Sequence, residues 1–141
     1  MPRMIFINLP VADLSRSVSL YASIGAKKDE RFSDATAACM TLSETIHVML
    51  LTHDKYRQFT TKPIADARET SAALLCLSAD SREAVDAITE SAGRSGARLD
   101  PSPVDDHGWM YGRSFEDPDG HMWSVMWMDL DAFMAAAAKA A

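Results

Sequence analysis

The sequence repeats one order of expected elements over most of its length, and this repeat constrains the fold more than any single motif. Apolar and alternating runs predict strands in the first half at residues 4–11, 26–31, 35–42 and 46–52. The same patterns predict strands in the second half at residues 71–79, 97–99, 109–116 and 121–128. In each half an amphipathic helix follows the first strand, over 13–24 and after a cap at Asp80 or Ser81. Both halves are therefore predicted to have the order β-α-β-β-β.

The length of 141 residues is typical of one domain, or of two small halves that share a core. We expect a single domain over residues 1–141, with one module at about 3–59 and the other at about 70–128. Residues 60–69 have little periodicity and are interpreted as a linker. Residues 129–141 are rich in alanine and predict a helical tail.

Charge and hydropathy exclude several classes of partner. The net charge of −6 argues against nucleic-acid binding, which requires a basic face. No apolar run approaches the length of a membrane span, and the start of the sequence does not resemble a secretory signal. Cys39 and Cys76 both lie in apolar, strand-like runs, so we expect them to be buried free thiols. These observations predict a cytoplasmic protein.

The segment 109–128 predicts two strands joined by a tight turn. A turn over Asp117–Gly120 is favoured because it contains a proline and ends in glycine. In that register Glu116 lies opposite His121. The odd-numbered residues of the first strand would then share a face with the even-numbered residues of the second. A single bulge would shift the register by one residue and move every side chain of one strand to the opposite face of the sheet.

That shared face combines aromatic rings with one arginine and one serine, namely Trp109, Tyr111, Arg113 and Ser124. Arg113 in an apolar cup requires a carboxylate partner or an anionic ligand. The alternative is that it snorkels past Phe115 to the rim. The rings of Tyr111 and Trp109 could stack on a planar ligand or serve as core aromatics. We therefore predict that this face binds a small anionic or aromatic molecule.

Two polar residues in the first half are further candidates for the site. Asn8 lies inside the first expected strand, where an asparagine is unusual, and its amide could both donate to and accept from a ligand. His47 is the one histidine on an expected strand that could face a cavity, although it could also be a polar residue at a strand edge. Methionines make the expected interior adaptable, at positions 40, 49, 110, 122, 126 and 128.

Two motifs, together with the repeat, resemble the vicinal oxygen chelate superfamily, which includes glyoxalase I, bleomycin-resistance proteins, fosfomycin-resistance proteins and extradiol dioxygenases. Residues 8–21, NLPVADLSRSVSLY, are similar to the family pattern V-x-D-L-x-x-S-x-x-F/Y after a strand. Residues 115–123, FEDPDGHMW, are similar to its pattern F-x-D-P-D-G-x-x-[IW]. The resemblance covers residues 4–128. It implies an α+β fold in which two βαβββ modules form curved mixed sheets around a cavity.

Metal-dependent members of this family place His, Glu or Gln ligands on the first and last strands of each module. By resemblance, the corresponding positions here are Phe6, a position near Leu74, Ser124, and Met49 or Leu50. Phe, Leu and Met do not hold a hard or borderline divalent ion, and a lone Ser hydroxyl is a poor ligand. We therefore expect no family-type metal site and no cofactor.

The resemblance implies two candidate functions. The first is a metal-independent binder of a small molecule, of the bleomycin-resistance kind. The second is a divergent metal-dependent glyoxalase (lactoylglutathione lyase) or dioxygenase, with a divalent metal relocated to His47 or His107 and Glu116 as a further ligand. Because many family members pair modules across subunits, the resemblance also implies a homodimer. The sequence leaves open whether the protein is an enzyme.

Overall fold

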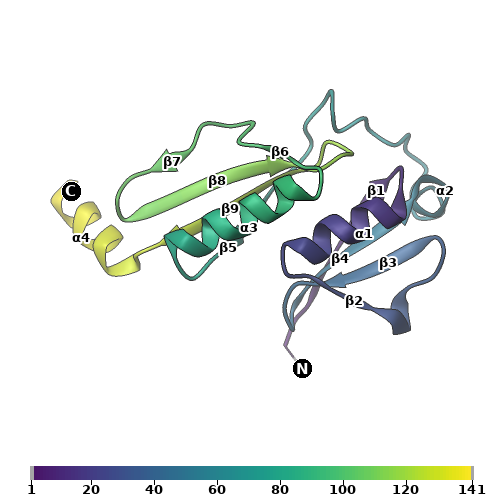
Figure 1. The fold of residues 1–141 in the computed structure, drawn as a ribbon, viewed down its shortest axis with the longest axis horizontal. Coiled ribbons are helices and arrows are strands. Elements are labelled where there is room, and N and C mark those ends of the chain that lie inside the picture. Colours follow the sequence, from purple (N-terminus) through teal and green to yellow (C-terminus); the bar gives the residue numbers. More distant parts are fainter. Residues whose placement is uncertain (1, 141) are drawn as a thin grey trace.

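The computed structural model describes residues 2–140 and contains two modules that lie beside one another (Figure 1). The first module consists of β1 (Ile5–Val11), α1 (Leu14–Ser23), β2 (Lys27–Asp29), β3 (Ala37–Thr41) and β4 (Ile46–Thr52). The second consists of β5 (Leu74–Ser78), α3 (Arg82–Arg94), β6 (Arg98–Leu99), β8 (Met110–Glu116) and β9 (Met122–Met128). The remaining elements are η1 (Glu30–Phe32), α2 (His53–Tyr56), β7 (Asp105–Asp106) and α4 (Leu130–Ala140).

Each module has one mixed sheet, and the two sheets follow the same plan. The strand order is β1-β4-β3-β2 in the first sheet and β5-β9-β8-β6 in the second, where β7 also pairs with β8. The first strand of each module is parallel to the last, and the other neighbours are antiparallel. In Figure 1, α1 and α3 lie on the same side of the molecule, each over its own sheet. The predicted α+β fold of two βαβββ modules is confirmed, with two separate open sheets in one chain.

Local sequence signals explain where the two long helices begin and end. The side chain of Asp13 accepts a hydrogen bond from the Arg16 amide at 3.1 Å and so caps α1. Ser81 caps α3 in the same way, through the Ala84 amide at 3.0 Å, and is the one of the two candidate caps that the structure uses. After α1 the chain turns at Gly25, whose φ of +104° favours glycine.

A single hydrophobic core extends through both modules. The ring of Trp123 packs edge-on against Tyr21, with 5.8 Å between the ring centroids. Nearby, the Ser23 hydroxyl donates to the Ser91 carbonyl at 3.3 Å, which joins α1 to α3. The buried core draws on both halves of the chain, including Val11, Leu20, Tyr21, Met40, Val48, Leu50, Val85, Phe115, Trp123 and Val125. The two halves therefore share one core.

The β8–β9 turn is fastened to the first module at the end of β1. The carboxylate of Asp119 accepts hydrogen bonds from the Ala12 amide at 2.9 Å and the Ser17 hydroxyl at 3.4 Å. The His121 side chain lies with Nε2 2.8 Å from the Pro10 carbonyl. The two sequence motifs thus meet in space, because the turn of one binds the strand–helix junction of the other.

The predicted register of the β8–β9 hairpin is wrong by one residue. Glu116 pairs with Met122, and the Asp117 amide donates to the His121 carbonyl at 3.0 Å. Gly120, at φ +91°, adds a third residue to the loop, which is the arrangement of a hairpin with a glycine bulge. The shift leaves the faces of β9 as predicted and turns every side chain of β8 to the other face.

Two smaller features differ from the strands and thiols expected from the sequence. A short strand that the sequence did not predict, β7, is formed by Asp105–Asp106 and pairs with β8. Both cysteines are free, but only Cys39 is buried, so the expectation of a buried thiol is wrong for Cys76. Among residues 2–140, no helix has the length and apolar character needed to cross a membrane.

Candidate functional site

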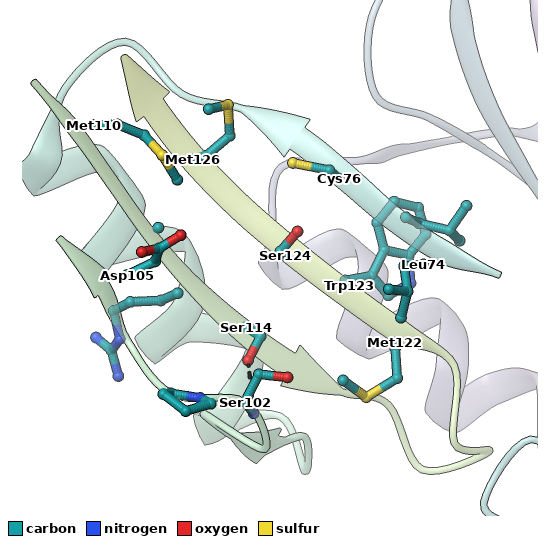
Figure 2. A pocket seen from close by; sticks show the side chains of 14 residues that line it. Leu74, Cys76, Ser102, Asp105, Met110, Ser114, Met122, Trp123, Ser124 and Met126 are labelled. Carbon is teal, nitrogen blue, oxygen red and sulfur yellow. Dashed lines mark hydrogen bonds between the residues drawn. The ribbon is translucent and has the colours of Figure 1, made fainter. Parts of the chain in front are cut away.

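The face of the second sheet opposite α3 carries a pocket of about 300 Å³ (Figure 2). This volume is at the small end of the range for ligand sites. Even-numbered side chains of β8 and β9 contribute to its floor, and methionine and leucine side chains dominate it. The lining consists of Leu74, Leu75, Cys76, Ser102, Pro103, Asp105, Met110, Gly112, Arg113, Ser114, Met122, Trp123, Ser124 and Met126.

Hydroxyl groups lie at the centre of this largely apolar pocket. Ser114 and Ser124 are direct partners across the β8–β9 ladder. The Ser102 amide donates to the Ser114 hydroxyl at 3.3 Å, which holds the segment after β6 against the pocket. Asp105 adds a carboxylate to the lining. The arrangement offers hydrogen-bond donors and acceptors to a small molecule, with a negative charge beside them.

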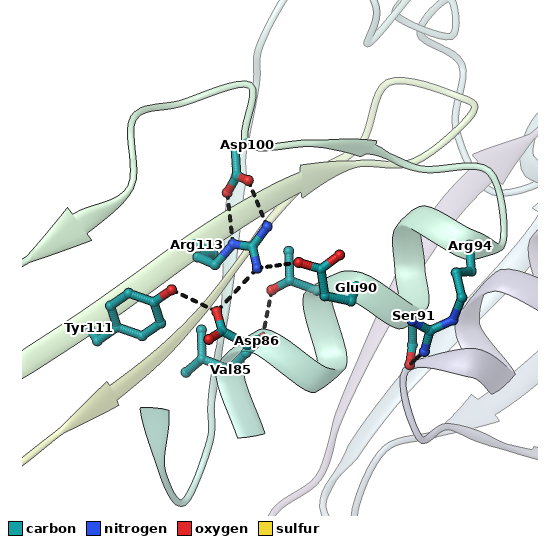
Figure 3. A network of polar contacts seen from close by, with 9 residues as sticks. Val85, Asp86, Glu90, Ser91, Arg94, Asp100, Tyr111 and Arg113 are labelled. Carbon is teal, nitrogen blue, oxygen red and sulfur yellow. Dashed lines mark hydrogen bonds and ion pairs between the residues drawn. The ribbon is translucent and has the colours of Figure 1, made fainter. Parts of the chain in front are cut away.

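Tyr111 and Arg113 lie on the opposite face of β8, toward α3, because of the register shift (Figure 3). The Arg113 side chain is only 11% exposed, and its guanidinium lies 3.1 Å from Asp86, 2.8 Å from Glu90 and 2.8 Å from Asp100. The Tyr111 hydroxyl donates to Asp86 at 2.6 Å. Arg113 borders the pocket, but its charge is directed to the helix side. The reason for placing these two side chains in the pocket wall therefore no longer holds.

Hydrogen bonds set the ionisation of this cluster. The bond from Tyr111, reinforced by Arg113, holds the pKa of Asp86 below its usual value. The contact with Asp100 has the largest effect on Arg113 and raises the pKa of its guanidinium. Arg113 is therefore charged and already matched by carboxylates. It offers no free charge to an anionic ligand in the pocket.

Asn8 and His47 lie on the first module. The Asn8 amide donates to the Phe6 carbonyl at 3.2 Å, and Asn8 lines a second cavity of about 290 Å³ between β1 and the chain leading into β5. The His47 ring stacks on Phe6, with 4.7 Å between centroids, and its Nδ1 lies 3.0 Å from the Thr41 hydroxyl. His47 Nε2 is buried and has no partner among the described residues.

Trp109 lies just before β8 and packs away from the pocket. Its ring lies 5.0 Å from the Phe133 ring of α4 and 5.3 Å from the ring of His107. Glu116, at the other end of β8, forms an ion pair with an arginine of β6 at 3.1 Å. One chain therefore does not bring His47, His107 and Glu116 together. Across residues 2–140, no group of three or more His, Cys, Asp or Glu side chains could hold a metal ion.

A match to a protein-family model establishes the family that the two sequence motifs indicated. The model for the Glyoxalase/Bleomycin resistance protein/Dioxygenase superfamily matches residues 3–125. The chain belongs to this superfamily. The match covers both modules, and a comparison of the sequence with curated proteins finds no match.

Solved structures similar to this glyoxalase-superfamily chain show the same fold at low sequence identity. A hypothetical protein from S. aureus has a TM-score of 0.74 at 21% identity, covering 90% of this chain and 94% of that one. A glyoxalase-related enzyme from Fulvimarina pelagi has a TM-score of 0.74 at 17% identity, covering 90% of this chain and 88% of that one. The fosfomycin resistance protein FosX from Mesorhizobium loti has a TM-score of 0.68 at 16% identity, covering 95% and 98%.

Among the predicted site residues, Ser124 lies on the pocket face of the second sheet, at the family ligand position that the resemblance assigned to it. The sequence interpretation missed the residues of β5 and β8 that share this face, namely Cys76, Met110, Gly112 and Ser114. For the residues of β8, the signal that could have found them is the glycine that ends the turn. A glycine bulge at Gly120 would have given the observed register and the observed face of β8.

Proposed function

We propose that this superfamily member binds a small neutral molecule, apolar or aromatic in its main part, in the pocket of its second sheet and without a metal at the family ligand positions. The observation that carries the proposal is the pocket itself, in which Ser114 and Ser124 lie among thioether and aliphatic side chains. An apolar cavity with a few convergent polar groups is the usual form of a small-molecule site.

The residues at the family ligand positions support a binder over a metal-dependent lyase or dioxygenase. Leu74 and Ser124 line the pocket, and Phe6 lies on the first strand. None of these side chains is a good ligand for a divalent ion. The charge distribution also favours a neutral ligand over an anion, because Asp105 lines the pocket while Arg113 is paired on the other side of β8.

The test is a metabolite screen followed by amide chemical shifts of isotope-labelled protein. We expect a hit to shift the amides of Gly112, Ser114 and Ser124, and we expect Gly112→Leu, which fills the pocket, to abolish binding. Asn8→Ala alters the cavity between β1 and the chain leading into β5, and Asn8 does not line the pocket of the second sheet. This variant is the matched control, expected to bind as the wild type does. Hits that shift only residues of the first module, or that survive Gly112→Leu, would refute the proposal.

A divergent metal-dependent enzyme is the second candidate, and one observation favours it. His47 Nε2 is buried without a partner among the described residues, which is unusual for a ring nitrogen and would suit a ligand atom. The measurement is the metal content of untagged protein incubated with nickel, zinc, manganese and ferrous iron. About one ion per chain, lost in His47→Ala, would favour the enzyme. Unchanged metal content in that variant would remove His47 from any such site.

We also propose that the protein is a homodimer in which a second copy covers the open sheet faces. The supporting observation is apolar exposure on the open faces of the two strands that begin the modules: Phe6 is 47% exposed and Leu74 75%. β1 and β5 are also terminal in the strand orders of their sheets, so their outer edges are available to pair with another strand.

We propose a cytoplasmic location for the protein, and the free thiols of Cys39 and Cys76 support it.

A further inference from the structure

We propose that the junction between the two modules is a second binding site, which takes an aliphatic molecule with a carboxylate head. Two neighbouring cavities, of about 270 Å³ and 290 Å³, lie between β1, the linker and the β8–β9 turn, and together they form the junction site. Figure 1 shows the linker leaving α2 and passing the β8–β9 turn on its way to β5. Four residues border both cavities, namely Pro10, Ala65, Ala67 and His121. A ligand that occupies both cavities would span this shared boundary.

The smaller cavity is the polar end of the junction site. Its basic side chains come from α2, the linker and the β8–β9 turn, and they are His53, Arg57, Arg68 and His121. His53 and Arg57 lie on one face of α2, where the Arg57 amide donates to the His53 carbonyl at 3.0 Å. Guanidinium groups bind carboxylates through N–H donors arranged as a planar fork. This end of the site is therefore suited to an anionic head.

Within residues 2–140, both arginines of this cavity keep more unpaired N–H donors than Arg113 does. The Arg57 guanidinium pairs with Asp54 at 3.0 Å, but the Asp54 side chain is 97% exposed. Arg68 Nε lies 3.5 Å from Asp66 Oδ1, which is longer than an ordinary hydrogen bond. Exposed ion pairs of this kind contribute little energy, so a ligand carboxylate can replace them.

The two carboxylates that line the same cavity already accept hydrogen bonds from the protein. Asp119 accepts from the Ala12 amide at 2.9 Å and from the Ser17 hydroxyl at 3.4 Å. Asp66 Oδ1 accepts from the Arg68 amide at 3.1 Å. These bonds stabilise the negative charges where they are. The arginines are left as the charged groups of this cavity with unused hydrogen-bonding capacity.

The larger cavity is the apolar end of the junction site. Aliphatic side chains from β1, the linker and the start of β5 dominate it, namely Ile7, Leu9, Leu75, Met122 and the alanines at 65, 67, 72 and 73. Tyr56 of α2 reaches this cavity, one residue before the arginine that reaches the other. An alkyl chain gains free energy when it leaves water for such surroundings. The two ends together select an aliphatic carboxylate.

The junction site differs from the pocket of the second sheet. The two share Leu75 and Met122 as lining residues, whereas Ser114 and Ser124 line the pocket and not the junction site. Leu74 and Ser124, at metal positions of the superfamily, also lie outside the junction cavities. The inference therefore does not depend on the ligand proposed for the pocket.

The first experiment compares three ligands by isothermal titration calorimetry: octanoate, acetate and 1-octanol. We expect about one octanoate per chain, bound at least ~100-fold more tightly than acetate because its alkyl chain leaves water. We expect octanoate to bind about 10-fold more tightly than 1-octanol, because only the carboxylate pairs with the arginines. Equal affinities for octanoate and 1-octanol, or for octanoate and acetate, would overturn the proposal.

The second experiment removes the two arginines one at a time. Both are exposed, so Arg57→Gln and Arg68→Gln should remain folded. We expect each variant to bind octanoate about 5-fold more weakly and to bind 1-octanol within about 2-fold of the wild type. Arg94→Gln is the matched control, because Arg94 is an exposed arginine of α3 that lines neither cavity. Equal losses of octanoate affinity in all three variants would show a general effect of charge and would refute the site.

The third measurement locates the ligand through the amide chemical shifts of isotope-labelled protein. We expect octanoate to shift the amides of Ala65, Ala67 and His121, which border both cavities. Shifts centred on Ser114 and Ser124 instead would place octanoate in the pocket of the second sheet. That result would refute the junction site and leave the function proposed for the pocket untouched.

Discussion

At the residue scale, one hydroxyl links the two modules inside the core. The Tyr21 hydroxyl donates to the Asp117 carboxylate at 2.7 Å and accepts from the Trp123 indole at 2.9 Å. Burial raises the pKa of Tyr21, which keeps the hydroxyl a donor. Tyr21→Phe leaves a buried indole N–H and a buried carboxylate oxygen without this partner. We expect the free energy of unfolding, measured in urea, to fall by about 2–3 kcal/mol.

Tyr111→Phe is the matched control for this residue. Its hydroxyl also donates to a carboxylate, that of Asp86, but the Asp86 side chain is 49% exposed and water can replace the lost bond. We expect a loss below about 1 kcal/mol. Similar losses in the two variants would contradict the view that Tyr21 acts through buried partners.

At the element scale, Arg113 holds β8 to α3 and to the segment after β6. Arg113→Met leaves Asp86, Glu90 and Asp100 without their cation. Because Asp86 and Glu90 are about half exposed, solvent weakens each pair, and we expect a loss of about 1–3 kcal/mol at pH 7. Arg82→Met is the control. Its pair with Asp106 is more exposed, and we expect a loss below about 1 kcal/mol.

The same cluster predicts a pH dependence. The pKa of Asp86 is lowered in the folded protein, first by the Tyr111 hydrogen bond and then by Arg113. Its contribution is therefore present above the unfolded pKa of about 3.9 and is lost as the pH falls through the lower folded value. The stability difference between wild type and Arg113→Met, measured in urea from pH 7 to pH 3, should shrink below about pH 4. A constant difference would show that packing, not charge, holds β8 to α3.

The β8–β9 hairpin shows why elements were predictable from the sequence and their register was not. Apolar periodicity and turn residues located β9 and the Pro118 turn correctly, and these signals are local. The number of residues in the loop depends on whether Gly120 takes a positive φ and adds a bulge, and the turn motif is compatible with either length. One residue of loop length decides whether Arg113 faces a ligand or a helix.

Gly120 is also in close contact with the linker, and local sequence patterns do not reveal this contact. A Cβ at Gly120 would lie 2.4 Å from the Arg68 amide nitrogen, and its φ is +91°. Gly120→Ala should therefore lower the free energy of unfolding by at least about 3 kcal/mol, from strain and a backbone clash together. Gly108→Ala has a φ of +79° but open space around it, so a loss near 1 kcal/mol is expected there. Equal losses in urea denaturation would exclude the clash.

At the scale of the whole molecule, the repeat in the sequence predicts the paired modules and the shared core. It does not predict which residues form the pocket of the second sheet. Its residues come from β5, β8 and β9, and only the sheet order brings Cys76 beside the β9 side chains. The order of strands that are distant in sequence depends on the packing of the complete chain, and local sequence patterns carry no information on that packing. The metal positions were assigned by resemblance to the family, and they stay predictions.

The open faces of the two sheets lead to a prediction about assembly. If a second copy covers β5, Leu74→Glu buries one carboxylate in each subunit, and the dimer dissociation constant should rise at least ~100-fold. Phe59→Glu is the control, because Phe59 is 69% exposed but lies between α2 and the linker instead of on β5. Sedimentation equilibrium of both variants and the wild type measures the effect. A monomeric wild type, or equal weakening by the two substitutions, would show that the exposed face of β5 is not the dimer interface.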